Sequence, residues 1–387
     1  MSGERIGFVG RQALGDYDLG PEHPLSPVTR ARAVNLIRAY GLLDRPNVTE
    51  IAPRAATDEE IAGVHTEEYI AAVKRYDADP VEATALAAME WGLAAWGDTP
   101  AFAGMHTAAS EVCGSSLVAA LSVWNGDVDM VFAPGGGLHH AFATRAAGFC
   151  IYNDPAVAIR ALLDAGANRI AYVDVDVHHG DGTQWIFYDD PRVLTCSVHE
   201  DGRYLFPGTG GIEERGRDGG VGTSVNIPLP PFSGDTGYLR AIEEVIVPAV
   251  TAFGPEIIVT QNGVDPHHQD PLAHLQVTMD VYPRVWTILR ELAAATTGGR
   301  LVALGGGGYN PDVLPRAWAL LFADMVGADL DEDLPEAWLD EAREVVGPDV
   351  TTTLHGEGPF EAADEQRSAA DEEAARVVER AKAELLA

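Results

Sequence analysis

The sequence feature that most constrains the fold is the run from Ala171 to Asp181, which reads Ala-Tyr-Val-Asp-Val-Asp-Val-His-His-Gly-Asp. Valines separate Asp174, Asp176 and His178, and valine favours a strand over a helix. Alternate residues of a strand point to the same side, so we expect these three side chains on one face. Burying two carboxylates and an imidazole is costly unless a cation or hydrogen bonds compensate them. The run therefore predicts a buried strand that carries a metal site.

Other short apolar runs have the same form, because each is followed by a polar or glycine-rich cluster. Between them lie helical patterns, such as residues 238–253, expected to bend at Pro248, and the segment after Asp280. This alternation predicts a single α/β domain with a mainly parallel sheet flanked by helices. Such sheets bind ligands at the carboxyl ends of their strands. The predicted strands are 130–133, 170–177, 193–198, 257–260 and 301–304.

The sequence changes character after about Ala328. Acidic residues predominate beyond this point, and no further strand pattern appears. Ser368 followed by Asp371 resembles a capping box before a final helix. We therefore expect the domain that carries the site over residues 1–328, and peripheral helices with an acidic tail over 329–387.

Composition bounds the partners and the compartment. The chain has 59 acidic and 26 basic residues, a formal net charge of −33. Such a surface disfavours nucleic acid and anionic membranes and favours cationic partners. The three cysteines lack CxxC spacing, which argues against a disulfide framework or a thiolate metal site. The first residues show no signal pattern and no apolar run could span a bilayer, so we expect a cytoplasmic protein.

Three of the polar residues predict a catalytic metal. Asp176, His178 and the distant Asp265 would give an oxygen and nitrogen ligand set with positions left open for water and substrate. Open sites are typical of catalytic zinc, whereas structural zinc is usually closed and rich in cysteine. The same ligand set also suits Fe²⁺.

The remaining polar residues suit proton transfer and oxyanion binding. His139 and His140 follow three glycines, and imidazoles titrate near neutral pH. Asp174 and Asp181 lie outside this ligand set, and each could orient one histidine. Tyr309 follows four glycines, and the lysine and Ser/Thr of a phosphate-binding loop are missing there. A hydroxyl directed at a developing oxyanion is the more specific interpretation.

Together these segments resemble the zinc-dependent histone deacetylase superfamily, and most of all its bacterial acetoin-utilisation deacetylases and the class I enzymes. The resemblance runs from Glu22-His-Pro-Leu-Ser-Pro27 to Gly305-Gly-Gly-Gly-Tyr-Asn310. It implies the arginase–deacetylase fold, one parallel sheet flanked by helices, in agreement with the strand pattern. The motifs between are Pro-Gly-Gly-Gly-Leu-His-His140, Gly-Phe-Cys-Ile-Tyr-Asn-Asp154, Val-Asp-Val-Asp-Val-His-His-Gly-Asp-Gly-Thr183, Phe-Pro-Gly-Thr-Gly210 and Gln-Asn-Gly-Val-Asp265.

The resemblance also implies roles for individual residues. His140 matches the general base and acid, paired with Asp181, and His139 matches its partner, paired with Asp174. Tyr309 matches the hydroxyl that stabilises the oxyanion. The implied zinc ligands are Asp176, His178 and Asp265. The implied substrate contacts are the rim carboxylate Asp98, the backbone of Gly148, the tunnel walls Phe149 and Phe206, and Leu272 and Gly307. The implied potassium ligands are Asp174, Ser197 and Val198 with the backbone of Asp176 and His178.

The function implied by the resemblance is hydrolysis of the acetamide of N6-acetyl-lysine in proteins, with release of acetate and lysine. Acetylated proteins would be the partners, with acetyl-CoA synthetase and other metabolic enzymes as candidates. Three alternatives stay open: an acetylpolyamine amidohydrolase, a binuclear manganese ureohydrolase of the same fold, and a non-catalytic acetyl-lysine reader. After Asp265 the chain reads Pro-His-His-Gln, where class I relatives carry small residues, so the rim is expected to differ.

Overall fold

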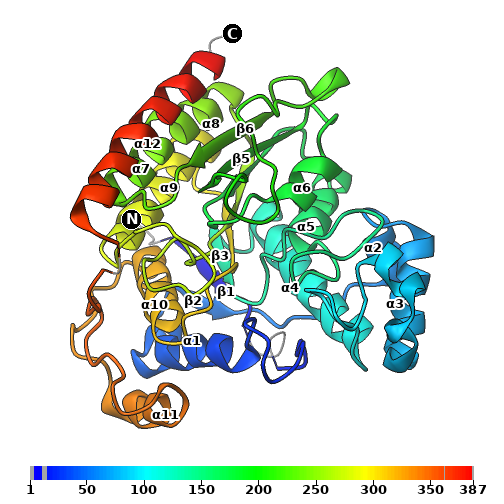
Figure 1. Ribbon diagram of the computed structural model, residues 1–387, viewed down its shortest axis with the longest axis horizontal. Helices are drawn as coiled ribbons and strands as arrows, with labels where there is room; N and C mark the ends of the chain where they lie inside the picture. The colour runs from blue at the N-terminus through cyan, green and yellow to red at the C-terminus, as the bar shows by residue number, and fades with distance from the viewer. Residues whose placement is uncertain (1–3, 11–14, 361, 386–387) are drawn as a thin grey trace.

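The computed structural model describes residues 4–10, 15–360 and 362–385, and a single parallel sheet organises them (Figure 1). The strand order is β2-β1-β3-β8-β7-β4-β5-β6, and every neighbouring pair is parallel. The predicted parallel α/β fold is confirmed. The strands are β1 (Ile6–Phe8), β2 (Val48–Glu50), β3 (Met130–Ala133), β4 (Ile170–Asp174), β5 (Val193–Glu200), β6 (Ser224–Leu229), β7 (Ile257–Gln261) and β8 (Leu301–Leu304).

Alternate residues of the strands pack into two different apolar layers. Ala171 and Val173 of β4 belong to the larger core, whereas Ile170 and Tyr172 belong to a core on the opposite face. A strand that is apolar on both faces is typical of a parallel sheet covered by helices on each side. The helices α1 (Pro27–Ala39), α9 (Val281–Thr297) and α10 (Val313–Val326) cover the first face, and α4 (Met105–Trp124) and α5 (Asp154–Asp164) cover the second.

The end of β4 differs from the sequence prediction. The strand was expected to continue to Val177, but it ends at Asp174, so Asp176 and His178 lie in the following loop. Side-chain carboxylates accept the next backbone N–H groups: Asp174 Oδ1 accepts that of Asp176 at 3.2 Å, and Asp176 Oδ1 accepts that of His178 at 2.9 Å. These local bonds replace the ladder bonds that a longer strand would need.

The two predicted helical patterns are present, and the first contains an irregular turn. The chain forms α7 (Asp235–Ala241), a π-helical turn η5 (Ile242–Ile246) and α8 (Val247–Phe253). The irregular turn lies just before Pro248, which lacks the N–H that a regular helix would donate to the preceding turn. The second pattern forms α9, which starts directly after Asp280 as predicted.

The C-terminal segment packs against the main domain. Helix α12 (Asp364–Leu385) lies along α7 and β6 (Figure 1), and Val377 and Val378 belong to the larger core. The predicted capping box is wrong, because the helix begins at Asp364 and Ser368 lies inside it. The division into residues 1–328 and 329–387 stays a prediction. Residues 1–3 and 386–387, at the outer ends of these two segments, lie outside the described residues.

The remaining helices are short and lie around the sheet. None of the helices within the described residues combines the length and apolar character that crossing a bilayer requires. These elements are η1 (Leu42–Asp44), α2 (Asp58–Ala62), α3 (Glu67–Ala78), η2 (Pro80–Thr84), η3 (Leu86–Trp91), α6 (Asp181–Ile186), η4 (Asp218–Gly220) and α11 (Glu336–Val346).

Candidate active site

The polar clusters found in the sequence follow four strands that are neighbours in the sheet. His139 and His140 follow β3, Tyr309 follows β8, Asp265 follows β7, and the run ending at Asp181 follows β4. These strands lie side by side in the order β3-β8-β7-β4. Since all of them are parallel, their carboxyl ends face one edge, where such sheets bind ligands.

Asp176, His178 and Asp265, called here the active-site ligand group, converge as predicted. One ligand atom from each lies within 4.8 Å of the other two, and all three side chains are buried. His178 Nδ1 is 3.1 Å from Asp176 Oδ1 and 3.1 Å from Asp265 Oδ2. Burial raises the pKa of Asp265, and the charge of Asp176 raises it further, to about 8. A divalent cation would relieve this repulsion, so the donor set fits a metal ion.

Hydrogen bonds orient the two carboxylates. Asp176 Oδ2 accepts the Gln261 side-chain amide at 2.7 Å and the Gly307 N–H at 2.8 Å. Asp265 Oδ1 accepts the Val177 N–H at 2.9 Å. A Cβ on Gly307 would lie 2.1 Å from Asp265 Oδ2, so only glycine lets the backbone come this close. Gly307, expected from the resemblance to contact substrate, here supports the ligand group.

The two histidines form the pairs that the sequence predicted. His139 Nδ1 is 2.7 Å from Asp174 Oδ2, and His140 Nδ1 is 2.7 Å from Asp181 Oδ1. The two Nε2 atoms face each other at 3.0 Å. Each carboxylate fixes the orientation of its imidazole through Nδ1.

The two imidazoles differ in electrostatic environment. Burial lowers the pKa of His139, but the charges of Asp174 and Asp176 outweigh burial and raise it to about 9. Burial lowers the pKa of His140 as well, and the charge of His139 lowers it further. His140 therefore favours the neutral form, in which it accepts a proton at neutral pH.

Aromatic side chains surround this site. The Tyr309 ring lies edge-to-face with the His178 ring, with centroids 6.4 Å apart, and with the Phe149 ring at 5.7 Å. The Phe206 ring lies edge-to-face with the His140 ring at 5.0 Å. Phe206 is 43% exposed and Phe149 is half-buried, whereas the ligand group is buried.

The other predicted substrate residues lie around Phe149 and Tyr309. Asp98 Oδ2 accepts the Gly148 N–H at 3.0 Å, so this carboxylate fixes the backbone next to Phe149. Leu272 is half-buried, and its N–H donates to Asp270. The geometry brings these positions to the site, and their contacts with a substrate stay predictions.

The predicted potassium ligands lie beside the ligand group. Asp174 of β4 is paired with Ser197 of β5 in the parallel register, and Val198 is the next residue along β5. Asp176 and His178 continue directly from the end of β4. The potassium site itself stays a prediction.

Three buried residues of the site were not assigned from the sequence. Gln261 holds Asp176, and the Asp270 carboxylate accepts the Tyr309 N–H at 2.8 Å. Asp154 accepts the N–H groups of Gly137 at 2.9 Å and Leu138 at 2.7 Å, which fixes the loop before His139. Gln261 and Asp154 belong to motifs noted in the sequence, whereas Asp270 had no such signal.

Comparisons with known proteins agree with this geometry. A family model described as "Histone deacetylase domain" matches residues 23–325. The chain is 42% identical over 333 residues to the acetoin utilization protein AcuC of Bacillus subtilis, which covers 86% of this chain and 85% of that protein. The Staphylococcus xylosus protein of the same name is 38% identical, covering 87% and 86%.

A solved structure shares the fold. The crystal structure of an HDAC homolog from Aquifex aeolicus superposes with a TM-score of 0.80 at 31% sequence identity. The superposition covers 96% of this chain and 100% of that chain. The structure of an HDAC homolog complexed with SAHA gives the same values.

Proposed function

Since the chain belongs to the histone deacetylase family, we propose that this deacetylase hydrolyses the acetamide of N6-acetyl-lysine in proteins, releasing acetate and the free lysine amine. The observation that carries the proposal is the convergence of Asp176, His178 and Asp265 beside His140 and Tyr309. Phe149 beside Tyr309 and Phe206 beside His140 offer apolar rings that suit the aliphatic stem of a lysine side chain.

The ligand group fits zinc, and Fe²⁺ is compatible with the same donors. Asp176, His178 and Asp265 would hold the ion. Such an ion polarises a bound carbonyl and lowers the pKa of a bound water. Gln261 and Gly307 keep the Asp176 carboxylate in place.

His140 is proposed as the proton carrier. Its Nδ1 is held by Asp181, its Nε2 lies 3.0 Å from His139 Nε2, and its ring lies 5.9 Å from the His178 ring. In the neutral form, Nε2 takes a proton from the attacking water, and the resulting imidazolium passes that proton to the lysine nitrogen as it leaves. His139, held by Asp174, donates its Nε2–H toward the same region.

Tyr309 is proposed as the donor to the oxyanion. Burial raises the pKa of its hydroxyl well above its usual value, so the phenol keeps its proton at neutral pH. A protonated hydroxyl near the ligand group can donate to the oxygen that becomes negative when water attacks the amide carbonyl. The Asp270 carboxylate holds the Tyr309 backbone N–H and so fixes this residue in the chain.

The substrate contacts, the potassium site and the partners are part of the same proposal. Asp98 and Gly148 would meet the backbone of a peptide substrate, with Phe149, Phe206 and Leu272 along the lysine stem. The acidic net charge suits lysine-rich protein segments. The AcuC relatives are named as acetoin utilization proteins, which supports a role in acetoin utilisation. Acetylated metabolic enzymes such as acetyl-CoA synthetase, in the cytoplasm, are the proposed partners.

A substrate panel tests the proposal. Purified protein is assayed with acetyl-lysine peptides, acetylpolyamines and longer acyl-lysine peptides, each with and without a chelator that removes divalent metal. We expect turnover of acetyl-lysine peptides that chelator abolishes and that added Zn²⁺ restores. Faster turnover of acetylpolyamines would favour the amidohydrolase alternative, and chelator-resistant turnover would overturn the metal-dependent mechanism.

A further inference from the structure

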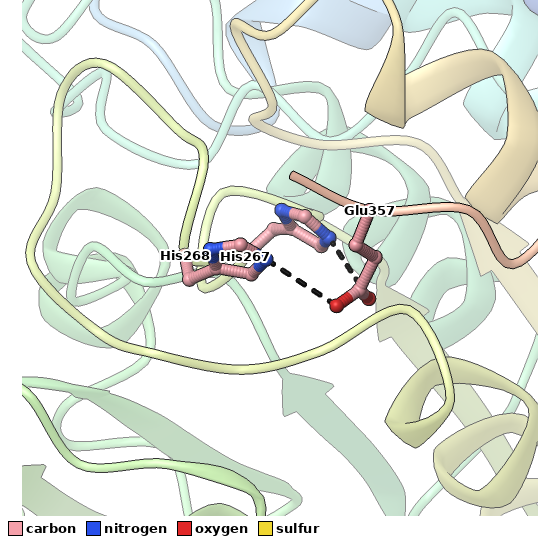
Figure 2. A group of neighbouring side chains, drawn as sticks. All are labelled: His267, His268 and Glu357. Atoms are coloured by element: carbon pink, nitrogen blue, oxygen red, sulfur yellow. Dashed lines mark ion pairs between the residues drawn. The ribbon is translucent and has the colours of Figure 1, made fainter. Parts of the chain in front are cut away.

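A second group of metal-ligand side chains lies outside the active site. It consists of His267, His268 and Glu357, called here the second ligand group (Figure 2). One ligand atom from each lies within 4.8 Å of the other two. The histidines belong to the loop after β7, whereas Glu357 comes from the segment between α11 and α12. Residues about ninety positions apart therefore meet at one point.

The histidines direct nitrogen atoms toward the same carboxylate. His267 Nε2 lies 3.4 Å from one Glu357 oxygen and His268 Nε2 lies 3.3 Å from the other (Figure 2). Two ligand atoms of a tetrahedral zinc ion lie about 3.3–3.4 Å apart when the metal–ligand bonds are about 2.0–2.1 Å. Each nitrogen–oxygen distance lies within this spacing, with one carboxylate oxygen facing each ring.

Buried nitrogens in this group lack partners. His267 is 1% exposed and His268 is 6% exposed. Within the described residues, His267 Nε2 and both ring nitrogens of His268 have no hydrogen-bond partner. Buried polar atoms are nearly always paired, so the two Nε2 atoms that face one carboxylate without a hydrogen bond call for a ligand. Glu357 is itself held by the Met279 N–H, which keeps its carboxylate beside the rings.

From these contacts we propose that His267, His268 and Glu357 form a second, structural divalent-cation site that binds zinc. Two imidazoles and a carboxylate are established zinc donors, and the fourth position is left for water. Zinc accepts the lone pairs of both Nε2 atoms and the charge of Glu357, which compensates the buried polar atoms. The inference does not depend on the substrate of the active site.

The main competing arrangement is an ion pair without metal. In it, protonated or neutral imidazoles donate N–H groups to Glu357. His267 Nδ1 accepts the Gln269 N–H at 3.1 Å, which places the proton of a neutral ring on Nε2. Zinc at Nε2 moves that proton to Nδ1 and replaces this hydrogen bond. His268 loses no bond on binding zinc, because both of its nitrogens are unpaired within the described residues.

The charges around the group permit a cation. A surface hollow lined by Gln269, Asp349 and Glu357 lies beside the group on the side of its carboxylate. The positive charge of Arg316 acts on His267. The Arg316 guanidinium is itself paired with Asp312 and with backbone carbonyls of the C-terminal segment. Its charge is therefore largely compensated.

The position of the site explains what zinc would stabilise. The loop that carries the two histidines starts at the active-site ligand Asp265 and continues to Asp270, which holds the Tyr309 N–H. The backbone carbonyl of Gln269, in the same loop, accepts a hydrogen bond from the Asn310 side-chain amide at 2.9 Å. Zinc would link this loop to the C-terminal segment that carries Glu357. It would thereby stabilise the positions of Asp265 and of Tyr309, which the loop holds through Asp270.

Metal counting on the full-length protein tests the proposal. The protein is stripped with chelator, reloaded with Zn²⁺, freed of excess ion by gel filtration and analysed by mass spectrometry. The proteins compared are wild type, Glu357→Gln, Asp176→Asn and the control His355→Ala. The control removes a histidine of the same segment whose only carboxylate partner among the described residues is Glu332.

We expect two zinc ions per chain in wild type and in His355→Ala, and one in each of Glu357→Gln and Asp176→Asn. One zinc in wild type, or two in Glu357→Gln, would overturn the second site and leave an ion pair. The wild-type count needs no variant, so misfolding of Glu357→Gln cannot conceal the result. Zn²⁺ should also raise the melting temperature of Asp176→Asn, and no shift would contradict a structural site.

Discussion

The two ligand groups use the same kinds of donor, but the protein holds them differently. In the active-site ligand group, hydrogen bonds from Gln261, Gly307 and Val177 orient the carboxylates. In the second ligand group, one backbone N–H holds the carboxylate, and His268 is oriented by packing against the rings of His267 and Phe360. The active site is therefore the more rigid of the two.

This difference indicates what each ion would do. Ligands that are oriented beforehand lose little freedom on binding, so a preorganised site favours tight binding and fixed geometry, as catalysis requires. Ligands from two remote segments are ordered by the ion itself, so binding energy becomes folding energy. The comparison predicts that changes in the active site alter chemistry and affinity, and that changes in the second group alter stability.

The largest effect is expected from Tyr309→Phe, which separates chemistry from metal binding. Loss of an oxyanion donor should lower kcat/KM for acetyl-lysine peptides roughly a hundredfold or more. Zinc content should stay at the wild-type value, because the phenol is not a metal ligand. Peptide turnover and metal analysis check this, with Tyr40→Phe as a control that removes a phenol bonded to the Asp331 carbonyl. A fully active Tyr309→Phe protein would refute the role of the hydroxyl.

A smaller effect is expected from Gln261→Met, which tests whether hydrogen bonding distinguishes the two groups. The methionine keeps the length of the side chain but removes the donor to Asp176. Loss of such an outer partner typically weakens metal affinity by roughly 10–100-fold. Competition between the protein and a chelator of known affinity measures this, with the exposed Gln366→Met as the matched control. Unchanged affinity would mean that Gln261 does not preorganise the site.

Much of the candidate site could be predicted from the sequence. We grouped Asp176, His178 and the distant Asp265 from the rule that ligands bind at the carboxyl ends of parallel strands. The roles of Gln261 and Asp154 depend on which strands are neighbours. That order, β3-β8-β7-β4, is a product of tertiary packing and has no local signal.

The errors also have local physical causes. The alternation of valine and aspartate predicts a strand that continues to Val177. In the structure, aspartate carboxylates accept backbone N–H groups, and β4 ends at Asp174. The predicted strands did not include β1, β2 or β6. Strand β6 contains Pro228, which is tolerated because β6 lies at the edge of the sheet. The meeting of Glu357 with the loop after β7 joins two segments without any shared sequence pattern.

The smallest effect is expected from His355→Ala, which sets the scale for an ordinary ion pair beside the second ligand group. His355 Nδ1 lies 2.7 Å from Glu332, but the side chains are 35% and 54% exposed, so solvent screens their attraction. Its loss should change the free energy of unfolding by less than about 1 kcal/mol, with or without Zn²⁺. In a protein whose active-site ligand group is disabled by Asp176→Asn, we expect Zn²⁺ to stabilise the fold through the second ligand group. Adding Glu357→Gln to that protein should abolish this stabilisation. Chemical denaturation at fixed Zn²⁺ measures the free energy of unfolding of each variant. If His355→Ala and Glu357→Gln lose the same free energy, the second ligand group is an ordinary ion pair as well.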